Sequence, residues 1–342
     1  MPPPPYLEIA DLLRDGKVIP FLGAGVNFGT RQPPDALWDE RSSHFLPSGP
    51  ELSRYLARRI SFPSDQPHDL DDLAKVAAYF VETSARVRLR ERLQDIFVRE
   101  YTPSSVHLHL ADIARKSEAE IAEQPEGRKE PGTPLLVVTT NYDDLLEQAF
   151  NALGRPYDLV IYPTDRKDIA ASVLWWPHGA GEPEAVAPNQ LCIDLKNTNV
   201  IYKMHGSVDR GRRNLDSFVI TEDDYIDFLS RMTTQGGAVP AQFMRYFRAR
   251  HFLFLGYGLG DWNLRVVLRN LRNILPPEDA GAGGETAAAP RPLSPADDQE
   301  LTSWAIQFRP TDLEKELWRA RKVKIYDQDI NAFVRGLREE VQ

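Results

Sequence analysis

The stretch that decides the fold is VIPFLGAG, residues 18–25, in which a short apolar run leads directly into a Gly-Ala-Gly turn. Three later stretches have the same order, an apolar run and then a polar or glycine motif: LLVVTTNYD at residues 135–143, VIYKMHGS at 200–207 and FLFLGYG at 252–258. Apolar runs of this length, rich in branched and aromatic residues, are typical of buried parallel strands. We therefore expect an α/β protein with a doubly wound parallel sheet.

The four units span most of the chain, and we interpret residues 1–342 as a single domain. Helical periodicity over about residues 51–115 predicts a helical insertion packed beside the sheet. Residues 29–50 predict a long irregular loop, and residues 175–199 either a flap or a plain surface loop. Residues 276–298 are rich in Ala, Gly and Pro, which predicts a mobile loop. The sheet core is then expected at about residues 1–30, 133–275 and 300–342.

Composition excludes several classes of protein. The net charge is 41 − 50 = −9, which argues against direct nucleic-acid binding, because such binding needs a basic surface. The single cysteine, Cys192, can form neither an internal disulfide nor a thiolate zinc site. No apolar run approaches the roughly 20 residues that span a bilayer, and Met1 is followed by four prolines rather than a signal peptide. We expect a soluble, cytoplasmic protein that does not bind membranes.

The carboxyl ends of parallel strands meet at one edge of a sheet, so the four motifs should converge on one crevice. Gly23-Ala24-Gly25 suits a dinucleotide pyrophosphate, because glycines permit a tight turn and close approach of the backbone. By itself this motif is a weak indicator. The next glycine, Gly29, comes one position later than in the usual fingerprint, and residues 29–50 do not predict an immediate helix.

Asn141 and Asp143 place an amide and a carboxylate at the mouth of the second strand. They could orient a ribose hydroxyl or a water, or Asn141 could simply cap a helix over residues 142–153. His205 follows the third strand and suits a general base, although a lone histidine at a strand end is more often structural. The turn at residues 256–258 leads to Asp261, which we interpret as the cap of a helix over residues 262–275.

Other residues carry weaker indications. His107 and His109 lie in a helical segment, where a spacing of two does not place both on one face, so packing is favoured over a metal site. A second His-Gly pair, His178-Gly179, follows a Trp-Trp-Pro run and is expected at a rim. Trp38 could stack on a base or anchor its own loop, and the sequence does not decide between the two.

Taken together, the four units resemble the sirtuin family, in its zinc-free bacterial branch found in antiviral defence, from about residue 10 to residue 340. The resemblance implies a Rossmann-like fold with no zinc module. It implies catalytic roles for Asn141, Asp143 and His205, with His205 as the base and the other two beside the nicotinamide ribose. The residues that it implies in NAD binding are Gly23, Ala24 and Gly25 at the pyrophosphate, Gly256, Tyr257 and Gly258 on the adenosine side, and also Asn27, Thr140, Asn141, Asp143, His205 and Asn263.

Two departures from the deacylating sirtuins affect the expected reaction. Those enzymes carry four zinc-binding cysteines and a Gly-Ile-Pro-Asp-Phe-Arg segment, of which this chain has only Pro34-Asp35 in residues 31–38. The resemblance therefore implies an NAD hydrolase that uses NAD as its substrate, needs no zinc and releases nicotinamide and ADP-ribose. The alternatives are an NAD-dependent protein deacylase and a non-catalytic module that senses NAD or ADP-ribose.

Control of such an activity is the last expectation. An enzyme that depletes the cell's own cofactor must be held inactive until it is triggered. The chain contains no recognisable sensor domain. We therefore expect a homo-oligomer, or a separate ATPase or sensor partner, to supply the control.

Overall fold

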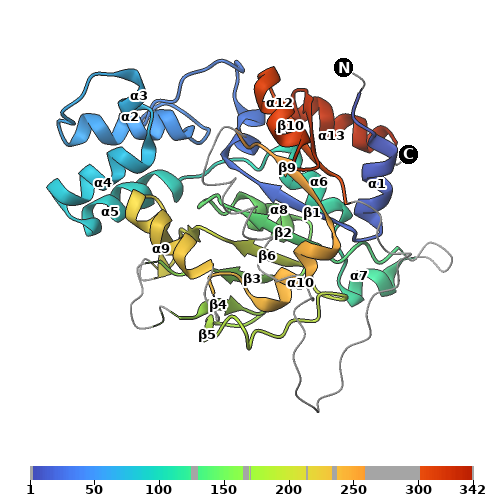
Figure 1. Cartoon of the computed structure of the whole chain (residues 1–342). Coiled ribbons are helices and arrows are strands. Elements are labelled where there is room, and N and C mark those ends of the chain that lie inside the picture. The colour runs from blue at the N-terminus through green and yellow to red at the C-terminus, as the bar shows by residue number, and fades with distance from the viewer. Residues whose placement is uncertain are drawn as a thin grey trace, which may run out of the picture.

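A nine-stranded sheet forms the centre of the protein (Figure 1). The computed structural model describes residues 3–124, 130–164, 169, 171–212, 215–232, 237–258 and 301–340. Within them the strand order is β11-β10-β9-β1-β2-β6-β3-β4-β5, parallel from β11 to β3 and antiparallel from β3 to β5. The strands are β1 Val18–Leu22, β2 Leu136–Thr139, β3 Asp158–Ile161, β4 Val173–Trp176, β5 Glu184–Val186, β6 Val200–Lys203, β9 His251–Leu255, β10 Ser303–Gln307 and β11 Val323–Asp327.

The register of the central strands aligns their carboxyl ends. Leu22, the last residue of β1, pairs with Leu255 of β9 on one side and with Thr139 of β2 on the other. Thr139 in turn pairs with Lys203, the last residue of β6. All four sequence motifs therefore leave the sheet at the same level, as the parallel arrangement predicts.

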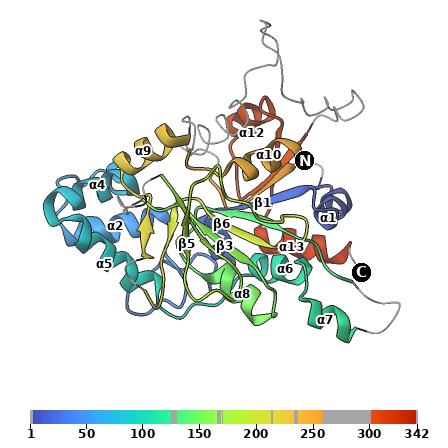
Figure 2. The ribbon, with the colours of Figure 1, turned by 90° about the horizontal axis from the view of Figure 1, so that it is seen from below.

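Helices cover both faces of the sheet (Figure 2). On one face, α9, α10 and α12 contribute Phe228, Phe243 and Trp318 to a buried cluster with the sheet. On the other, α1, α6, α8 and α13 pack in a second cluster. The helices are α1 Tyr6–Arg14, α6 Ser105–Ile113, α8 Leu145–Ala152, α9 Glu222–Met232, α10 Ala241–Ala249, α12 Asp312–Arg319 and α13 Ile330–Glu339. The predicted α/β fold, with a mostly parallel central sheet, is confirmed.

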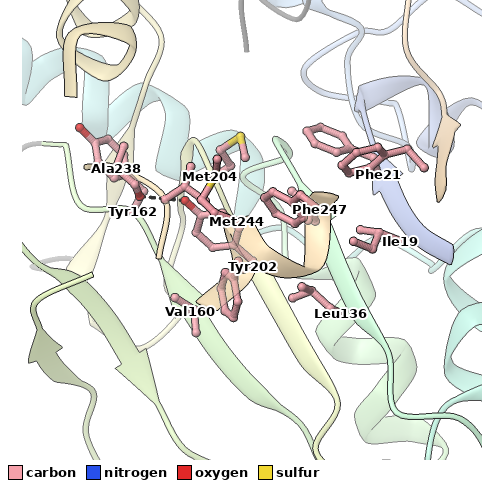
Figure 3. Close-up of a cluster of buried hydrophobic side chains, with 14 of the residues drawn as sticks. Ile19, Phe21, Leu136, Val160, Tyr162, Tyr202, Met204, Ala238, Met244 and Phe247 are labelled. Carbon is pink, nitrogen blue, oxygen red and sulfur yellow. Dashed lines mark hydrogen bonds between the residues drawn. The ribbon is translucent and has the colours of Figure 1, made fainter. Parts of the chain in front are cut away.

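The first cluster surrounds Tyr202 of β6, which lies among Val160, Met204 and Met244 in Figure 3. Its ring packs against Phe243 with the centroids 5.2 Å apart. Tyr202 is fully buried, and its hydroxyl donates to the carbonyl oxygen of Ala238 at 3.0 Å. A buried phenol needs such a partner because an unpaired hydroxyl costs free energy in an apolar interior. The side chains of Val200, Tyr202 and Met204, which precede His205, are thus packed in the protein interior.

Between β1 and β2 the chain forms a group of helices at one side of the sheet, blue to cyan in Figure 1: α2 Gly49–Arg59, α3 Pro67–Leu70, α4 Leu73–Ser84 and α5 Arg86–Phe97. They share a third apolar cluster, which also takes in Tyr142, Leu145 and Phe218. The next helix, α6, packs instead against α8 and α13 in the second cluster. The division into one domain with an insertion over residues 51–115 stays an interpretation.

Local structure differs from expectation in three places. A 3-10 helix, η1 Ala24–Thr30, follows the first glycine turn directly, where no immediate helix was expected. α8 begins at Leu145 rather than at residue 142. Residues 175–199 include the end of β4 and all of β5, which extend the sheet as an antiparallel edge, whereas the rest of the segment forms loops as expected. The expected helix over 262–275 and loop over 276–298 lie outside the described residues.

The remaining short elements are α7 Glu118–Glu123 and a two-stranded ribbon of β7 Gly206–Ser207 and β8 Ser217–Phe218. The ribbon follows β6 immediately, and Val219 N donates to the carbonyl oxygen of His205 at 2.9 Å. These contacts therefore hold the backbone of the third motif at residues 205–207. No helix in the described ranges is both long and apolar enough to cross a bilayer.

Two phenylalanines test the position of the core. Phe150 of α8 is fully buried in the second cluster, whereas Phe308, just after β10, is 65% exposed. Phe150→Ala should lower the free energy of unfolding by about 3–5 kcal/mol, because it removes buried contacts and leaves a cavity. Phe308→Ala should change it by less than about 0.5 kcal/mol. Urea unfolding checks both, and equal effects would contradict this packing.

Candidate active site

The first and fourth motifs lie backbone against backbone. Gly25 N donates to the carbonyl oxygen of Gly256 at 2.9 Å, and Gly23 N donates to that of Leu255 at 2.9 Å. Gly256 has a φ of +72°, and a Cβ there would come within 2.2 Å of Val26 N. Glycine is therefore required at residue 256 by both its conformation and its surroundings.

The second motif is tied to both glycine turns. Asn141 N donates to Thr139 Oγ1 at 3.0 Å, and Asn141 Nδ2 donates to the carbonyl oxygen of Gly23 at 3.2 Å. The hydroxyls of Thr140 and Tyr257 are hydrogen bonded at 2.6 Å. The interpretation of Asn141 as a helix cap is wrong, because Asp144 occupies the capping position of α8.

Asp143 is buried and held at both carboxylate oxygens. Its Oδ1 accepts from Leu145 N at 3.1 Å, in the first turn of α8, and its Oδ2 accepts from Asn27 Nδ2 at 3.1 Å. The amide oxygen of Asn27 is buried, and it has no hydrogen-bond partner among the residues that the structure describes. These two contacts fix the orientation of the carboxylate in the absence of any ligand.

His205 is 8% exposed, and its Nε2 has no hydrogen-bond partner in the described part of the chain. Its ring packs edge-on against Tyr225 and Phe228 of α9, with the centroids 5.4 Å and 5.2 Å apart. Burial lowers the pKa of His205 to about 3, so the imidazole is neutral at physiological pH. A neutral ring can accept a proton, although a pKa this low limits its basicity.

These residues face a cavity of about 380 Å³ at the carboxyl ends of the central strands. Gly23 and Gly25 do not line it, and their amides bond to Leu255 and Gly256. Asn263 lies outside the described residues. The predicted residues that line the cavity are Ala24, Asn27, Thr140, Asn141, Asp143, His205, Gly256, Tyr257 and Gly258. Their convergence on one cavity is the geometry that the four motifs predict.

Sequence reasoning missed an apolar part of the cavity lining. It consists of residues 46–50 together with Leu52, Leu73 and Phe97, from the loop before α2 and from the helical group. Arg31 fixes this loop with an ion pair to Glu51 of α2 at 2.5 Å. The residues carry no motif, and their side chains are mostly apolar, so the sequence does not mark them as part of a site.

Trp38 does not line the cavity. Its ring packs edge-on against Tyr55 of α2, with the centroids 5.4 Å apart, and it is 8% exposed. It therefore anchors the long loop, which decides between the two roles that the sequence leaves open.

Sequence reasoning also missed a buried cation beneath the second motif. Lys203 is fully buried, and its Nζ lies 2.7 Å from Glu147 Oε1 of α8. Burial raises the pKa of Glu147, and the Lys203 ammonium opposes this shift. A charged residue inside the apolar run at residues 200–204 is the one indication in the sequence, because a buried lysine needs a partner.

The other histidines are structural or lie outside the cavity. His107 is buried in α6, where its Nδ1 accepts from Ser104 N at 3.1 Å. His109 is buried in the same helix, and His178 is exposed after β4. In the residues that the structure describes, no group of three or more His, Cys, Asp or Glu side chains could hold a metal ion.

A family model described as a SIR2-like domain matches residues 135–325, which include the Asn141, His205 and Gly256 motifs. The chain belongs to the SIR2-like family. Curated relatives of this SIR2-like chain include Defense-associated sirtuin 2 of Bacillus subtilis, 20% identical over 78% of this chain and 20% of that protein. Two others are named NAD(+) hydrolase ThsA. The protein from Acinetobacter baumannii is 28% identical over 65% of this chain and 35% of its own length, and that from Enterococcus faecium is 24% identical over 78% and 42%.

The SIR2-like chain thus spans about a fifth to two fifths of the length of the curated relatives that it matches. The name of two of them records hydrolysis of NAD, and that of the third records a role in defence.

The contact between the glycine turns can be tested with two substitutions at positive φ. Gly154→Ala, at φ +63° with open space around it, should cost about 1–2 kcal/mol through backbone strain alone. Gly256→Ala adds a steric overlap with Val26 N and should cost clearly more. Denaturant unfolding measures both. Equal losses would mean that the two turns are not in direct contact.

The buried histidines predict a loss of stability in acid. Burial lowers the pKa of His107 and His109 to about 4 and that of His205 to about 3. The pKa of a histidine in the unfolded chain is about 6.5. Below that pH the unfolded chain binds protons that the folded protein does not, so the free energy of unfolding decreases as the pH is lowered. Each histidine should cost about 2 kcal/mol between pH 7 and pH 5.

Urea unfolding at pH 7 and pH 5 measures this loss, and His109→Phe removes one of the three groups without touching the cavity. The variant should lose about 2 kcal/mol less than the natural protein over that interval. An unchanged pH dependence in the variant would contradict the neutral, buried state of His109.

Proposed function

We propose that this chain hydrolyses NAD at the bond between nicotinamide and ribose and releases nicotinamide and ADP-ribose. The observation that carries the proposal is that His205, Asn141 and Asp143 line the same cavity, and that His205 Nε2 has no partner within the described ranges. The glycine turns beside them suit a pyrophosphate. The relatives named NAD(+) hydrolase ThsA support the same reaction.

Catalysis of this reaction depends mainly on positioning the substrate and on electrostatic stabilisation of the transition state. The bond between C1′ of the ribose and the nicotinamide nitrogen breaks, and its electron pair goes to the ring, which leaves as a neutral molecule. The ribose carbon then carries positive charge and takes the oxygen of a water, which loses a proton. His205 accepts that proton and passes it to solvent, a type of assistance worth about a hundred- to ten-thousand-fold in rate.

The contacts suggest how the other residues act. The side-chain nitrogen of Asn141 donates to the carbonyl oxygen of Gly23. The side-chain oxygen of Asn141 can then accept a hydrogen bond from a ribose hydroxyl or from the water. Asp143 is held by Asn27 and by the start of α8, so its charge is fixed in place before the substrate binds. A preorganised charge stabilises the developing cation without reorganising during the reaction.

In the cell, we propose that the activity depletes NAD during antiphage defence, under the control of a homo-oligomer or of a separate ATPase or sensor partner. Support comes from the relative named Defense-associated sirtuin 2 and from the greater length of the relatives, which contain sequence beyond the matched part. Control is required because uncontrolled hydrolysis would remove the cofactor from a healthy cell.

The test is chromatography of NAD and its products after incubation with the protein. The natural chain should release nicotinamide and ADP-ribose without an acylated peptide, and His205→Ala and Asn141→Ala should each lower kcat at least about 100-fold in a folded protein. His178→Ala is the matched control, because this second His-Gly pair is exposed and outside the cavity. It should retain full activity.

Each alternative has its own result. Release of nicotinamide only in the presence of an acylated peptide would identify a deacylase. Binding of NAD without turnover under every activating condition would identify a sensing module. Full activity of both His205→Ala and Asn141→Ala, with folding unchanged, would overturn the assignment of the site.

A further inference from the structure

We propose that Lys203 is a positioning residue for the reaction, which sets the geometry of the loop that carries Asn141 and Asp143. The inference rests on the proposed function, since it concerns the same cavity. Lys203 itself does not line the cavity and touches no reacting atom. It acts through the backbone of residues 142 and 143.

The Lys203 side chain lies on the face of the sheet that α8 covers. Tyr202 and Met204 belong to the apolar cluster on one face of the sheet, and Ile201 belongs to the cluster on the other. Because side chains alternate along a strand, Lys203 lies on the face of Ile201, where α8 packs. Its exposure is 0%, so the ammonium must find all of its partners within the protein.

The Lys203 ammonium binds two backbone carbonyls and one carboxylate. An ammonium has three donors, and Lys203 Nζ meets three acceptors: the carbonyl oxygen of Asp143, that of Tyr142 at 3.4 Å and Glu147 Oε1 at 2.7 Å. Two of the three belong to the loop between β2 and α8 rather than to a neighbouring side chain. The cation therefore holds backbone, and Glu147 balances its charge.

The backbone that Lys203 binds, at residues 142 and 143, belongs to the loop that carries Asn141 and Asp143. Residue 142 lies between Asn141 and Asp143, and the direction of the Asp143 side chain follows from the backbone torsions that Lys203 fixes. Lys203 is also two residues before His205 on the same strand end. One side chain thus joins the segment that bears His205 to the loop that bears the other two proposed catalytic residues.

A second buried cation, three residues after the end of α8, provides a matched structural control. Arg155, 7% exposed, follows the far end of α8 and donates to the carbonyl oxygens of Ala111 at 3.1 Å and Leu153 at 3.2 Å. It also pairs with Glu120. Like Lys203 it is buried, paired with a glutamate, bonded to backbone carbonyls and absent from the cavity lining. Unlike Lys203, it donates to carbonyls outside the loop that carries Asn141 and Asp143.

The experiment compares K203M/E147Q with E147Q and R155M. The double variant removes the ammonium without leaving an unpaired carboxylate, so E147Q is its reference. We measure thermal unfolding, kcat and KM for NAD below all the unfolding transitions, and hydrogen exchange of the amides in residues 141–145. K203M/E147Q should have a kcat about 100-fold below that of E147Q, the order expected when catalytic groups shift by about 1 Å, with a much smaller change in KM.

Loop amides should exchange faster in K203M/E147Q than in E147Q, since Leu145 N and Asn141 N bond to side chains that the loop positions. R155M should lower the unfolding temperature and leave kcat and this exchange unchanged.

A folded K203M/E147Q with the kcat and loop exchange of E147Q would overturn the inference. If the double variant does not fold, K203R replaces it. Its guanidinium keeps the charge but changes the donor geometry, so natural kcat and exchange in K203R would also overturn the inference.

Failure of the proposed function has a different signature. If the natural chain, E147Q and R155M all leave NAD intact under activating conditions, the proposed reaction is wrong. The hydrogen-exchange comparison still decides whether Lys203 orders residues 141–145, because it does not depend on turnover.

Discussion

The contact between the backbones of Gly25 and Gly256 is the constraint on which the rest of the site depends. The two turns end neighbouring strands, β1 and β9, that are paired residue for residue up to Leu22 and Leu255. Without side chains between them the turns can meet, and Gly23 then offers a carbonyl oxygen to Asn141. The second motif is thus oriented by the first, and the third is joined to the second through Lys203.

The sheet and the polar wall of the cavity could be predicted from the sequence. Buried parallel strands have a characteristic apolar pattern, and their carboxyl ends must lie together, so residues 23–25, 141–143 and 205 could be assigned to one crevice before any contact was known. The start of α8 could not be placed as well. Asn141, Asp143 and Asp144 are all good residues for a helix start, and only the bonds to Gly23 and Leu145 decide between them.

The apolar wall and the buried ion pair could not be predicted, for a physical reason. Leu46, Leu52 and Phe97 are ordinary core residues by type, and their place at the cavity follows from how the helical group docks. Lys203 is a charged residue in an otherwise apolar strand, which the sequence shows. Its partner Glu147 is 56 residues away and belongs to no recognisable motif. Contacts of this kind depend on tertiary packing, which local patterns do not encode.

The helices between β1 and β2 have an apolar cluster of their own, and that cluster includes Tyr142, the residue between Asn141 and Asp143. Tyr142 packs edge-on against Phe97 of α5, with the centroids 5.6 Å apart, and its hydroxyl donates to the carbonyl oxygen of Val219 at 2.6 Å. A ligand that fills the cavity touches both the helical group and this loop. A molecule that binds the outer surface of α2–α5 and shifts their docking therefore changes the affinity of the cavity for its ligand. By thermodynamic linkage, the cavity's ligand changes the affinity of the protein for that molecule by the same factor.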